Sequence, residues 1–204
     1  KNKFLSDESL NNLIKLSKSL GISLFATPGD LHSLDRLVKL KMPAIKISSG
    51  LLTNLPLIKE ASKKRVPIIL STGMAYMKEI SEAVNICKQK QNKIAILKCT
   101  SIYPAPIKNL NLNGIDRLKK SFNVPIGYSD HADGIDASVN AVALGARIIE
   151  KHFTLDKSKK GADHRISAEP KEFRNMVNKI KNLETMMGNK ILSPTKEEIK
   201  IRKF

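Results

Sequence analysis

Short apolar runs alternate along the chain with longer segments in which apolar residues recur at helical spacing. The short runs are typical of buried strands, and the longer segments are typical of amphipathic helices. The predicted strands begin at about residues 22, 44, 67, 94, 124 and 147. The predicted helices cover residues 7–20, 31–40, 54–64, 78–90, 115–122, 135–146 and 171–187. A helix between successive strands is the connection that parallel neighbours require, so the pattern predicts an α/β fold.

The predicted strands all end in small, polar or hydrogen-bonding residues, as at residues 27–30, 48–50 and 71–73. In a (β/α) barrel the carboxyl ends of all strands face one mouth, whereas an open doubly wound sheet gathers its ligand loops at one switch point. The repeated polar ends therefore favour a (β/α)8 TIM barrel. A closed barrel has eight strands and about 250 residues, so we expect an incomplete barrel with about six of its eight β/α units.

The composition is that of a single globular domain, with 204 residues of which 41% are hydrophobic. No apolar run approaches the ~18 residues of a membrane span, and residues 1–4 lack the apolar stretch of a signal peptide. We therefore predict a cytoplasmic protein without a membrane partner. Cys87 and Cys99 are expected to be reduced, structural thiols rather than a disulfide.

The chain is strongly basic, with 36 Lys and Arg against 19 Asp and Glu and a net charge of +17. Such a charge could attract nucleic acid, and a basic nucleic-acid module is one function class to consider. However, the lysines are dispersed over the predicted helices, and aromatic residues make up only 4% of the chain. No stacking motif or zinc finger is visible. The charge therefore favours attraction of phosphate-bearing small molecules, and no nucleic-acid partner is expected.

Three of the four histidines lie in residues 127–164. His131 and His152 each follow a predicted strand, and the intervening helix places both imidazoles on one rim of a parallel sheet. A single histidine at a strand end is usually a hydrogen-bonded capping residue. Two on one rim could bind a metal, and two neutral imidazoles suit zinc or iron, so the ligand set alone does not settle which metal is bound.

A series of motifs carries a family resemblance over nearly the whole chain. They are residues 22–28, KISSG (46–50) with residues 53–57, LSTGM (70–74), CTSIYPAP (99–106), SDH (129–131), residues 141–146, IEKHFT (149–154) and GADH (161–164). In this order they resemble the N-acetylneuraminate (sialic acid) synthase family, which includes legionaminic and pseudaminic acid synthases. The resemblance implies that residues 1–204 are a partial TIM-barrel synthase domain. It lacks the first two strands and the C-terminal antifreeze-like domain of a homodimeric parent, and would be inactive alone.

The resemblance also implies the reaction. Phosphoenolpyruvate condenses with the aldehyde of an N-acetylated amino sugar, either N-acetylmannosamine or a related 6-deoxy diamino sugar. The products are a nine-carbon 2-keto sugar acid and phosphate, and the reaction is assisted by a divalent metal, manganese or alternatively magnesium or cobalt. A metal of this kind acts as a Lewis acid on the aldehyde oxygen.

Site residues follow from the same motifs, residue by residue. The metal ligands are His131 and His152, and the catalytic group is His131, His152 and Asp163. Phosphoenolpyruvate is bound by Thr27, Ser49, Ser101 and Ser129, and the amino sugar by Tyr103 and Asp163. Lys46 and Lys98 are expected to face the mouth from strand interiors, where an anionic substrate would compensate their charge.

Two positions depart from the family pattern. Gly29 stands where the family usually has an aromatic residue, and Leu51 stands where it usually has a glutamate that contacts the sugar. The loss of that glutamate leaves the identity of the sugar open among sialic, legionaminic and pseudaminic acid precursors. It also motivates the alternative of a degenerate, non-catalytic barrel that acts as a binding subunit.

Overall fold

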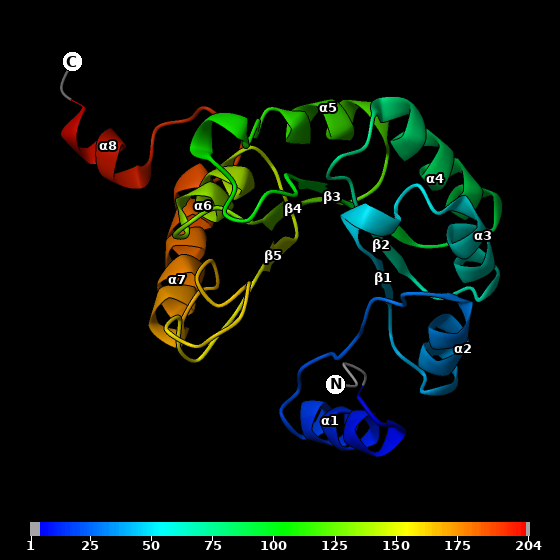
Figure 1. Ribbon diagram of the computed structural model, residues 1–204. Helices are drawn as coiled ribbons and strands as arrows, with labels where there is room; N and C mark the ends of the chain where they lie inside the picture. The colour runs from blue at the N-terminus through cyan, green and yellow to red at the C-terminus, as the bar shows by residue number, and fades with distance from the viewer. Residues whose placement is uncertain (1–4, 203–204) are drawn as a thin grey trace.

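A computed structural model describes residues 5–202 as a curved, parallel sheet with an outer layer of helices (Figure 1). The sheet has five strands in the order β1-β2-β3-β4-β5, and all neighbouring strands pair in parallel. The strands are β1 (Ile45–Ile47), β2 (Ile68–Ser71), β3 (Ile94–Cys99), β4 (Ile126–Asp130) and β5 (Ile149–Lys151). Sequence order equals spatial order, as in the wall of a barrel. The predicted α/β fold is confirmed as a five-stranded parallel half-barrel.

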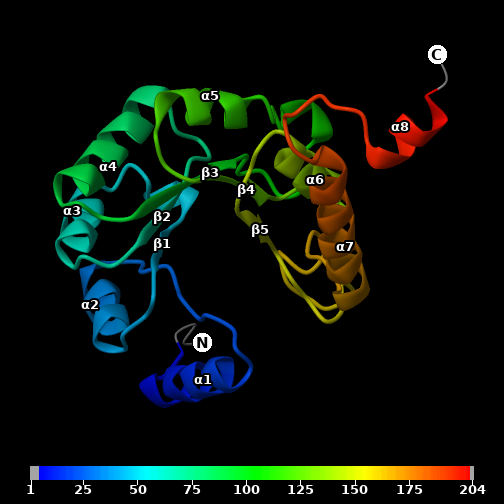
Figure 2. The same ribbon diagram turned by 180° about the vertical axis from the view of Figure 1, so that it is seen from behind.

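The helices do not all lie in one layer, because most follow the convex side of the sheet in an arc whereas the first lies at its open side and the last extends away (Figure 2). They are α1 (Asp7–Ser19), α2 (Leu31–Lys39), α3 (Leu55–Lys63), α4 (Met77–Gln89), α5 (Gly114–Ser121), α6 (Asp136–Ala143), α7 (Pro170–Met187) and α8 (Lys196–Ile201). Two 3-10 turns, η1 (Ser49–Leu51) and η2 (Ile107–Asn109), lie in the connections. The predicted helices are thus present, with ends that move by one to three residues. The sequence pattern did not predict α8, which extends away from the other helices (Figure 1).

Local sequence signals explain where individual helices begin. The Asp30 carboxylate accepts a hydrogen bond of 2.6 Å from the Ser33 backbone at the start of α2. The Asn54 side chain accepts one of 3.2 Å from the Leu57 backbone at the start of α3, where Pro56 occupies the first turn. Both residues satisfy N–H groups that have no partner within the helix, a contribution of typically ~1 kcal/mol. Such caps fix the length of each connection between a strand and its helix.

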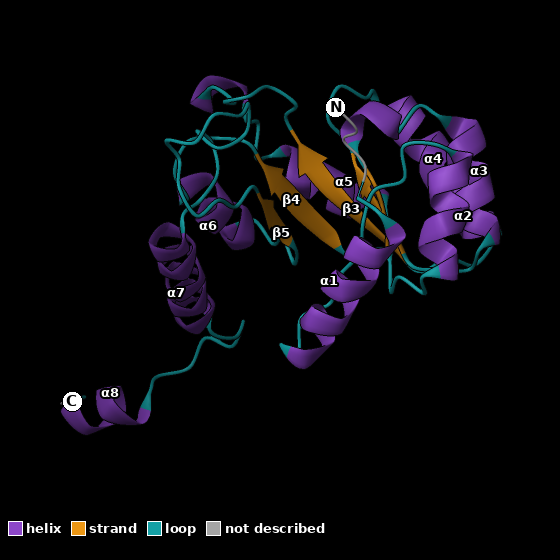
Figure 3. Cartoon of the chain, turned by 60° about the horizontal axis from the view of Figure 1, so that its bottom comes forward, coloured by secondary structure: helices purple, strands orange, loops and turns teal. Residues whose placement is uncertain are grey.

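The main hydrophobic core lies between the convex face of the sheet and the helices. Alternate strand residues enter it, including Ile47, Leu70 and Ile96, all of which are fully buried. Because successive strand residues point to opposite faces, their neighbours point to the concave face. Figure 3 shows β3, β4 and β5 lying side by side with helices on either flank. The helix layer therefore fixes the curvature that gathers the concave residues at the strand ends.

Close packing on the concave face requires glycine at position 127. A Cβ atom built on Gly127 would lie 2.5 Å from the Ile148 carbonyl oxygen and 2.8 Å from the Ile148 Cβ. Real side chains do not approach a neighbouring backbone so closely. Any larger residue would therefore push β4 away from the segment that leads into β5, and those two strands carry the two imidazoles.

The predicted strand at residues 22–26 is wrong. This segment forms only an isolated parallel bridge between Ala26 and Ile45, so the sheet has five strands rather than six. Within residues 5–202 no strand flanks its other side, and Ile22 is 62% exposed. A lone edge segment without a buried face gains too little free energy from burial to form a regular ladder of backbone hydrogen bonds. The number of units in the complete barrel therefore stays a prediction.

None of the helices in the described range is both long enough and apolar enough to cross a membrane.

Candidate functional site

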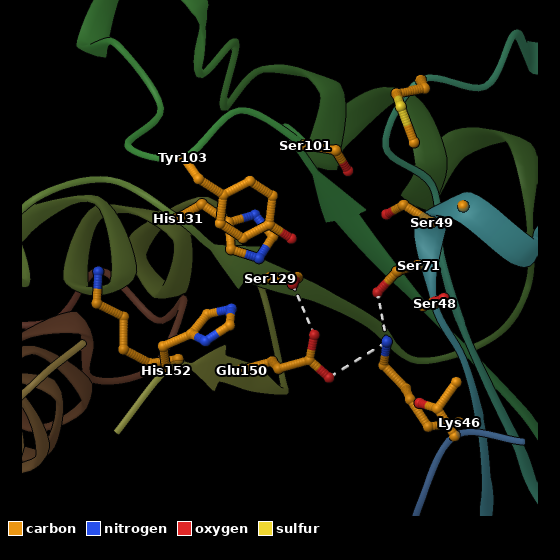
Figure 4. A pocket seen from close by; sticks show the side chains of 14 residues that line it. Lys46, Ser48, Ser49, Ser71, Ser101, Tyr103, Ser129, His131, Glu150 and His152 are labelled. Carbon is orange, nitrogen blue, oxygen red and sulfur yellow. Dashed lines mark hydrogen bonds and ion pairs between the residues drawn. The ribbon is translucent and has the colours of Figure 1, made fainter. Parts of the chain in front are cut away.

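A cavity of about 560 Å³ lies at the carboxyl ends of the strands, on the concave side of the sheet (Figure 4). Its walls come from every strand end and from the loops that follow them. The lining residues are Thr27, Lys46, Ser48, Ser49, Gly50, Ser71, Met74, Ser101, Tyr103, Ser129, His131, Glu150, Lys151 and His152. Seven of the eight predicted site residues are among them, so the structure gathers in one place residues that are up to 125 positions apart in sequence (152 − 27).

Three rings form one side of the cavity. The centroids of His131 and His152 are 5.3 Å apart, and Tyr103 lies 4.2 Å from His131 and 5.8 Å from His152. His131 follows β4 directly and His152 follows β5 directly, so the parallel pairing of these strands brings the two imidazoles together. The predicted common rim for both imidazoles is therefore confirmed.

The hydrogen bonds of His131 define which of its ring nitrogens can bind a ligand. Its Nδ1 lies 3.0 Å from the Thr100 carbonyl oxygen, which can only accept a hydrogen bond. In the neutral imidazole Nδ1 must then carry the proton, and Nε2 keeps its lone pair. A backbone carbonyl is a common partner for the non-ligating nitrogen of a metal-binding histidine. His131 is thus prepared to act as a ligand through Nε2.

A thiol adjoins the same imidazole. Cys99 Sγ lies 3.6 Å from His131 Nδ1 and 3.6 Å from Ser101 Oγ. Burial raises the pKa of the Cys99 thiol, but hydrogen bonds from His131, Ser49 and Ser101 outweigh burial and bring the pKa to about 7. Burial lowers the pKa of His131, and here too the hydrogen bonds with Cys99 and Thr100 prevail and raise it above 6.5. Both cysteines are free, as predicted, but Cys99 belongs to the surroundings of the site.

His152 has a different environment. Burial lowers its pKa below 6.5, and the opposing attraction of the Asp163 carboxylate is the smaller effect. Asp163 Oδ2 lies 3.9 Å from His152 Nδ1. The Asp163 side chain is 57% exposed and does not line the cavity, so it stands at the rim rather than within the site. His152 is therefore neutral near pH 7, which is the form that binds a metal.

The donor set can be tested against the predicted metal. Among residues 5–202 no group of three or more His, Cys, Asp or Glu side chains is placed to hold an ion. The chain therefore offers two imidazole nitrogens, and the other coordination positions would be filled by substrate or water. Imidazoles suit zinc or iron, and the oxygen ligands that water or substrate would add also suit manganese, so the residues fit a divalent metal without selecting one.

Opposite the rings, a chain of polar contacts crosses the cavity. Lys46 Nζ donates to Ser71 Oγ at 2.8 Å and lies 3.3 Å from Glu150 Oε2, and Ser129 Oγ donates to Glu150 Oε1 at 2.6 Å (Figure 4). These residues belong to β2, β1, β5 and β4, so the curvature brings the first and last strands of the sheet within contact distance. The Lys46 side chain is 9% exposed and Glu150 is 40% exposed, so the pair borders the open cavity.

Hydroxyl groups line the wall between Lys46 and the rings. The Gly73 backbone N–H donates to Ser49 Oγ at 3.0 Å. A side chain at Gly73 would overlap the hydroxyls of both Ser49 and Ser101, so glycine is needed for their approach. Thr27 joins the cavity from the segment before β1. The four predicted phosphoenolpyruvate residues thus line the same cavity, and their role stays a proposal.

The expectation that Lys98 faces the mouth is wrong. Its ammonium donates to the Leu110 carbonyl and, at 2.7 Å, to Thr100 Oγ1, and it lies 6.0 Å from the Tyr128 ring centroid. Burial lowers the pKa of Lys98. Lys98 and Tyr128 are cross-strand partners, and Tyr128 packs in the core under the helices. Strand alternation therefore places Lys98 on the convex face, where it anchors the loop before α5.

The sequence interpretation gave no role to six of the cavity residues, namely Ser48, Gly50, Ser71, Met74, Glu150 and Lys151. The alternation of side chains along a strand could have predicted two of them, Ser48 and Glu150. Side chains two apart in a strand share a face, so Glu150 shares the face of His152 and Ser48 shares that of Lys46. Leu51, for which the resemblance implied a glutamate, packs against the main core.

Comparison with known proteins now decides the family. Residues 1–192 match the NeuB family. The chain belongs to the NeuB family. It is 46% identical over 191 residues to the N,N'-diacetyllegionaminic acid synthase of Campylobacter jejuni, covering 92% of this chain and 57% of that protein. It is 37% identical over 193 residues to the human N-acetylneuraminate-9-phosphate synthase, covering 94% of this chain and 53% of that protein.

A solved structure shows the same fold. It is the N-acetylneuraminic acid synthetase of Leptospira borgpetersenii in complex with citrate, with a TM-score of 0.92 and 37% identity. The alignment covers 97% of this chain and 69% of that one. This NeuB chain spans little more than half the length of the two curated relatives, so the activity of the whole protein is a matter of proposal.

Proposed function

We propose that this NeuB protein condenses phosphoenolpyruvate with the aldehyde of an N-acetylated amino sugar. The reaction consumes one water, releases phosphate and forms a nine-carbon 2-keto sugar acid. The observation that carries the proposal is the composition of the cavity. One wall presents a buried ammonium and several hydroxyls, which suit an anion, and the facing wall presents two imidazoles, which suit a metal-bound oxygen donor.

Phosphoenolpyruvate carries a phosphate and a carboxylate, and both need donors. Lys46 supplies a charged donor, and Thr27, Ser49, Ser101 and Ser129 supply neutral ones. Hydrogen bonds to charged groups contribute about 1.5–3 kcal/mol, roughly twice the contribution of neutral ones. Lys46 already contacts Glu150 and Ser71, so its ammonium is held in place before the substrate arrives.

The amino sugar would occupy the side of the cavity with the rings. His131 and His152 would hold the divalent metal, which as a Lewis acid polarises the aldehyde oxygen. Tyr103 is 51% exposed beside both imidazoles, and Asp163 is at the rim, so both can contact sugar hydroxyls. Glu150 is the carboxylate that lines the cavity in the described part of the chain, so in this proposal it would accept a proton during water addition once Lys46 turns to the substrate.

The decisive experiment measures phosphate release from phosphoenolpyruvate by the intact protein with each candidate aldehyde. The higher identity to the legionaminic acid synthase, 46% against 37%, favours testing a diacetylated 6-deoxy amino sugar before N-acetylmannosamine. Manganese, magnesium and cobalt are compared with a chelator. The proposal requires aldehyde-dependent phosphate release that the chelator abolishes, and absence of release with every aldehyde would refute it.

Leu51 motivates a second candidate, a barrel that binds phosphoenolpyruvate without turning it over. Its side chain packs on the core, so no carboxylate reaches the sugar from this position. Calorimetric titration separates the two candidates. Binding of phosphoenolpyruvate without phosphate release, and without response to any aldehyde, would identify the binding subunit.

A further inference from the structure

A buried ion pair lies behind the imidazole pocket, on the convex face of the sheet. Asp130 Oδ2 is 3.2 Å from Lys151 Nζ, and the two side chains are 0% and 1% exposed. The residues are cross-strand partners in the β4–β5 register. Removing two charges from water carries a large desolvation cost, so such a pair persists only where further hydrogen bonds satisfy both groups.

Those hydrogen bonds converge on one backbone residue and one helix. The Ala132 N–H donates to Asp130 Oδ1 at 2.9 Å, and Lys151 Nζ donates to the Ala132 carbonyl at 2.5 Å. Ser138 of α6 donates to Asp130 Oδ2 at 2.6 Å. The pair therefore binds both the backbone N–H and the carbonyl of Ala132, and the Ser138 hydrogen bond connects it to the helix layer.

The place of this network in the sequence links it to the site. Asp130 precedes His131, Ala132 follows His131, and Lys151 precedes His152. Strand alternation turns the ion pair toward the helices and the imidazoles toward the cavity, and Lys151, although it also borders the cavity, has a side chain that is only 1% exposed. The backbone on both sides of His131 and the start of the His152 segment are thus held by one set of contacts.

We propose that Asp130, Lys151 and Ser138 form a positioning network that sets the separation and orientation of the two imidazoles. The role in turnover rests on the proposed function, whereas the effect on ring geometry does not. A well-packed apolar pair of similar volume could stabilise the sheet equally well. It could not hold the N–H and carbonyl of Ala132. The ion pair is also neutral as a unit, so it positions the rings without adding net charge beneath them.

The test uses a mild variant, a neutralising variant and a matched control in the intact protein. Ser138→Ala removes one hydrogen bond from Asp130, and the double variant Asp130→Asn with Lys151→Met removes the pair without leaving a lone charge. Ser62→Ala is the control, because Ser62 is also 0% exposed and bonds a helix carbonyl, that of Lys59, at 2.8 Å.

Two readouts are compared. We expect kcat to fall about 10-fold in Ser138→Ala and up to about 100-fold in the double variant, with the KM for phosphoenolpyruvate within about twofold. Nuclear Overhauser contacts between the ring protons of His131 and His152, recorded without metal or substrate, should weaken in both variants. Ser62→Ala should change neither readout.

The outcomes are distinguishable. If wild type releases no phosphate, the proposed function fails, while the ring contacts still test the positioning network. If Ser138→Ala matches Ser62→Ala in both kcat and ring contacts, the network is only structural and the inference is overturned. If the double variant folds and keeps wild-type ring contacts, the inference is likewise overturned. If it does not fold, Ser138→Ala alone decides.

Discussion

Two buried lysines lie on opposite faces of the sheet and have different surroundings. On the concave face, Lys46 contacts Ser71 and Glu150 beside an open cavity. On the convex face, Lys98 is bonded to the Leu110 carbonyl beneath the helices. Their exposures, 7% and 9%, are nearly the same. Burial alone therefore does not identify a binding residue, because a lysine that is held by a backbone carbonyl beneath the helices is as buried as one beside the candidate site.

The same contrast separates the two cysteines. Cys99 contacts His131 at the cavity side, with a thiol pKa of about 7, whereas burial raises the pKa of Cys87, in the helix layer, to about 11. The thiolate forms above the pKa, so the two thiolate-to-thiol ratios should differ by about 10⁴-fold at any pH between these values. Thiolate absorbance in the ultraviolet should rise through about pH 7. Cys99→Ser should remove that rise and Cys87→Ser should keep it. A titration midpoint two pH units higher would contradict this difference between Cys99 and Cys87.

The largest effect on turnover is expected from His131→Ala. The variant loses one of two imidazoles on the concave face, so manganese binding should disappear and kcat should fall at least about 10³-fold, since Lewis-acid stabilisation is worth several kcal/mol. Calorimetric titration with manganese measures the binding. His32→Ala, at an exposed position on α2, serves as the control. Unchanged manganese affinity in His131→Ala would remove this residue from the metal site.

The two lysines provide the direct test of the comparison. Lys46→Met should raise the KM for phosphoenolpyruvate about 10- to 100-fold, because one charged hydrogen bond to the substrate is lost. Lys98→Met should leave that KM unchanged and lower the free energy of unfolding by about 1–3 kcal/mol, because the Leu110 carbonyl loses its partner. Urea denaturation and steady-state kinetics measure both quantities. Equal KM effects in the two variants would contradict the assignment of faces.

The smallest effect is expected from Thr27→Ala. This variant removes one neutral donor at the edge of the cavity, so the KM for phosphoenolpyruvate should rise about 2- to 10-fold, equivalent to about 0.5–1.5 kcal/mol. Manganese affinity should stay the same. Thr53→Ala, at an exposed position outside the cavity, is the control. A loss of manganese binding in Thr27→Ala would show that the two walls of the cavity are not separate.

The sequence alone determined the order of helices and strands and the rim of the sheet on which the candidate site residues lie. Helical spacing and capping residues are local, so α1 and α3 begin and end within one residue of their predicted bounds. His131 and His152 could be assigned to one rim because parallel strands end on the same side. The family motifs then gave seven of the cavity residues, with Asp163 at the rim rather than in the lining.

Only the tertiary structure decided which residues meet and which face each one serves. Lys46 and Glu150 touch because curvature brings β1 and β5 together, and no local pattern encodes a contact between strands that do not pair. Residues 22–26 have the composition of a strand but lack a neighbour on one side, so they form a single bridge. Lys98 turns to the helices because its register partner Tyr128 does. Strand pairing, curvature and register are properties of the assembled sheet, so the hydrophobic periodicity of one segment does not encode them.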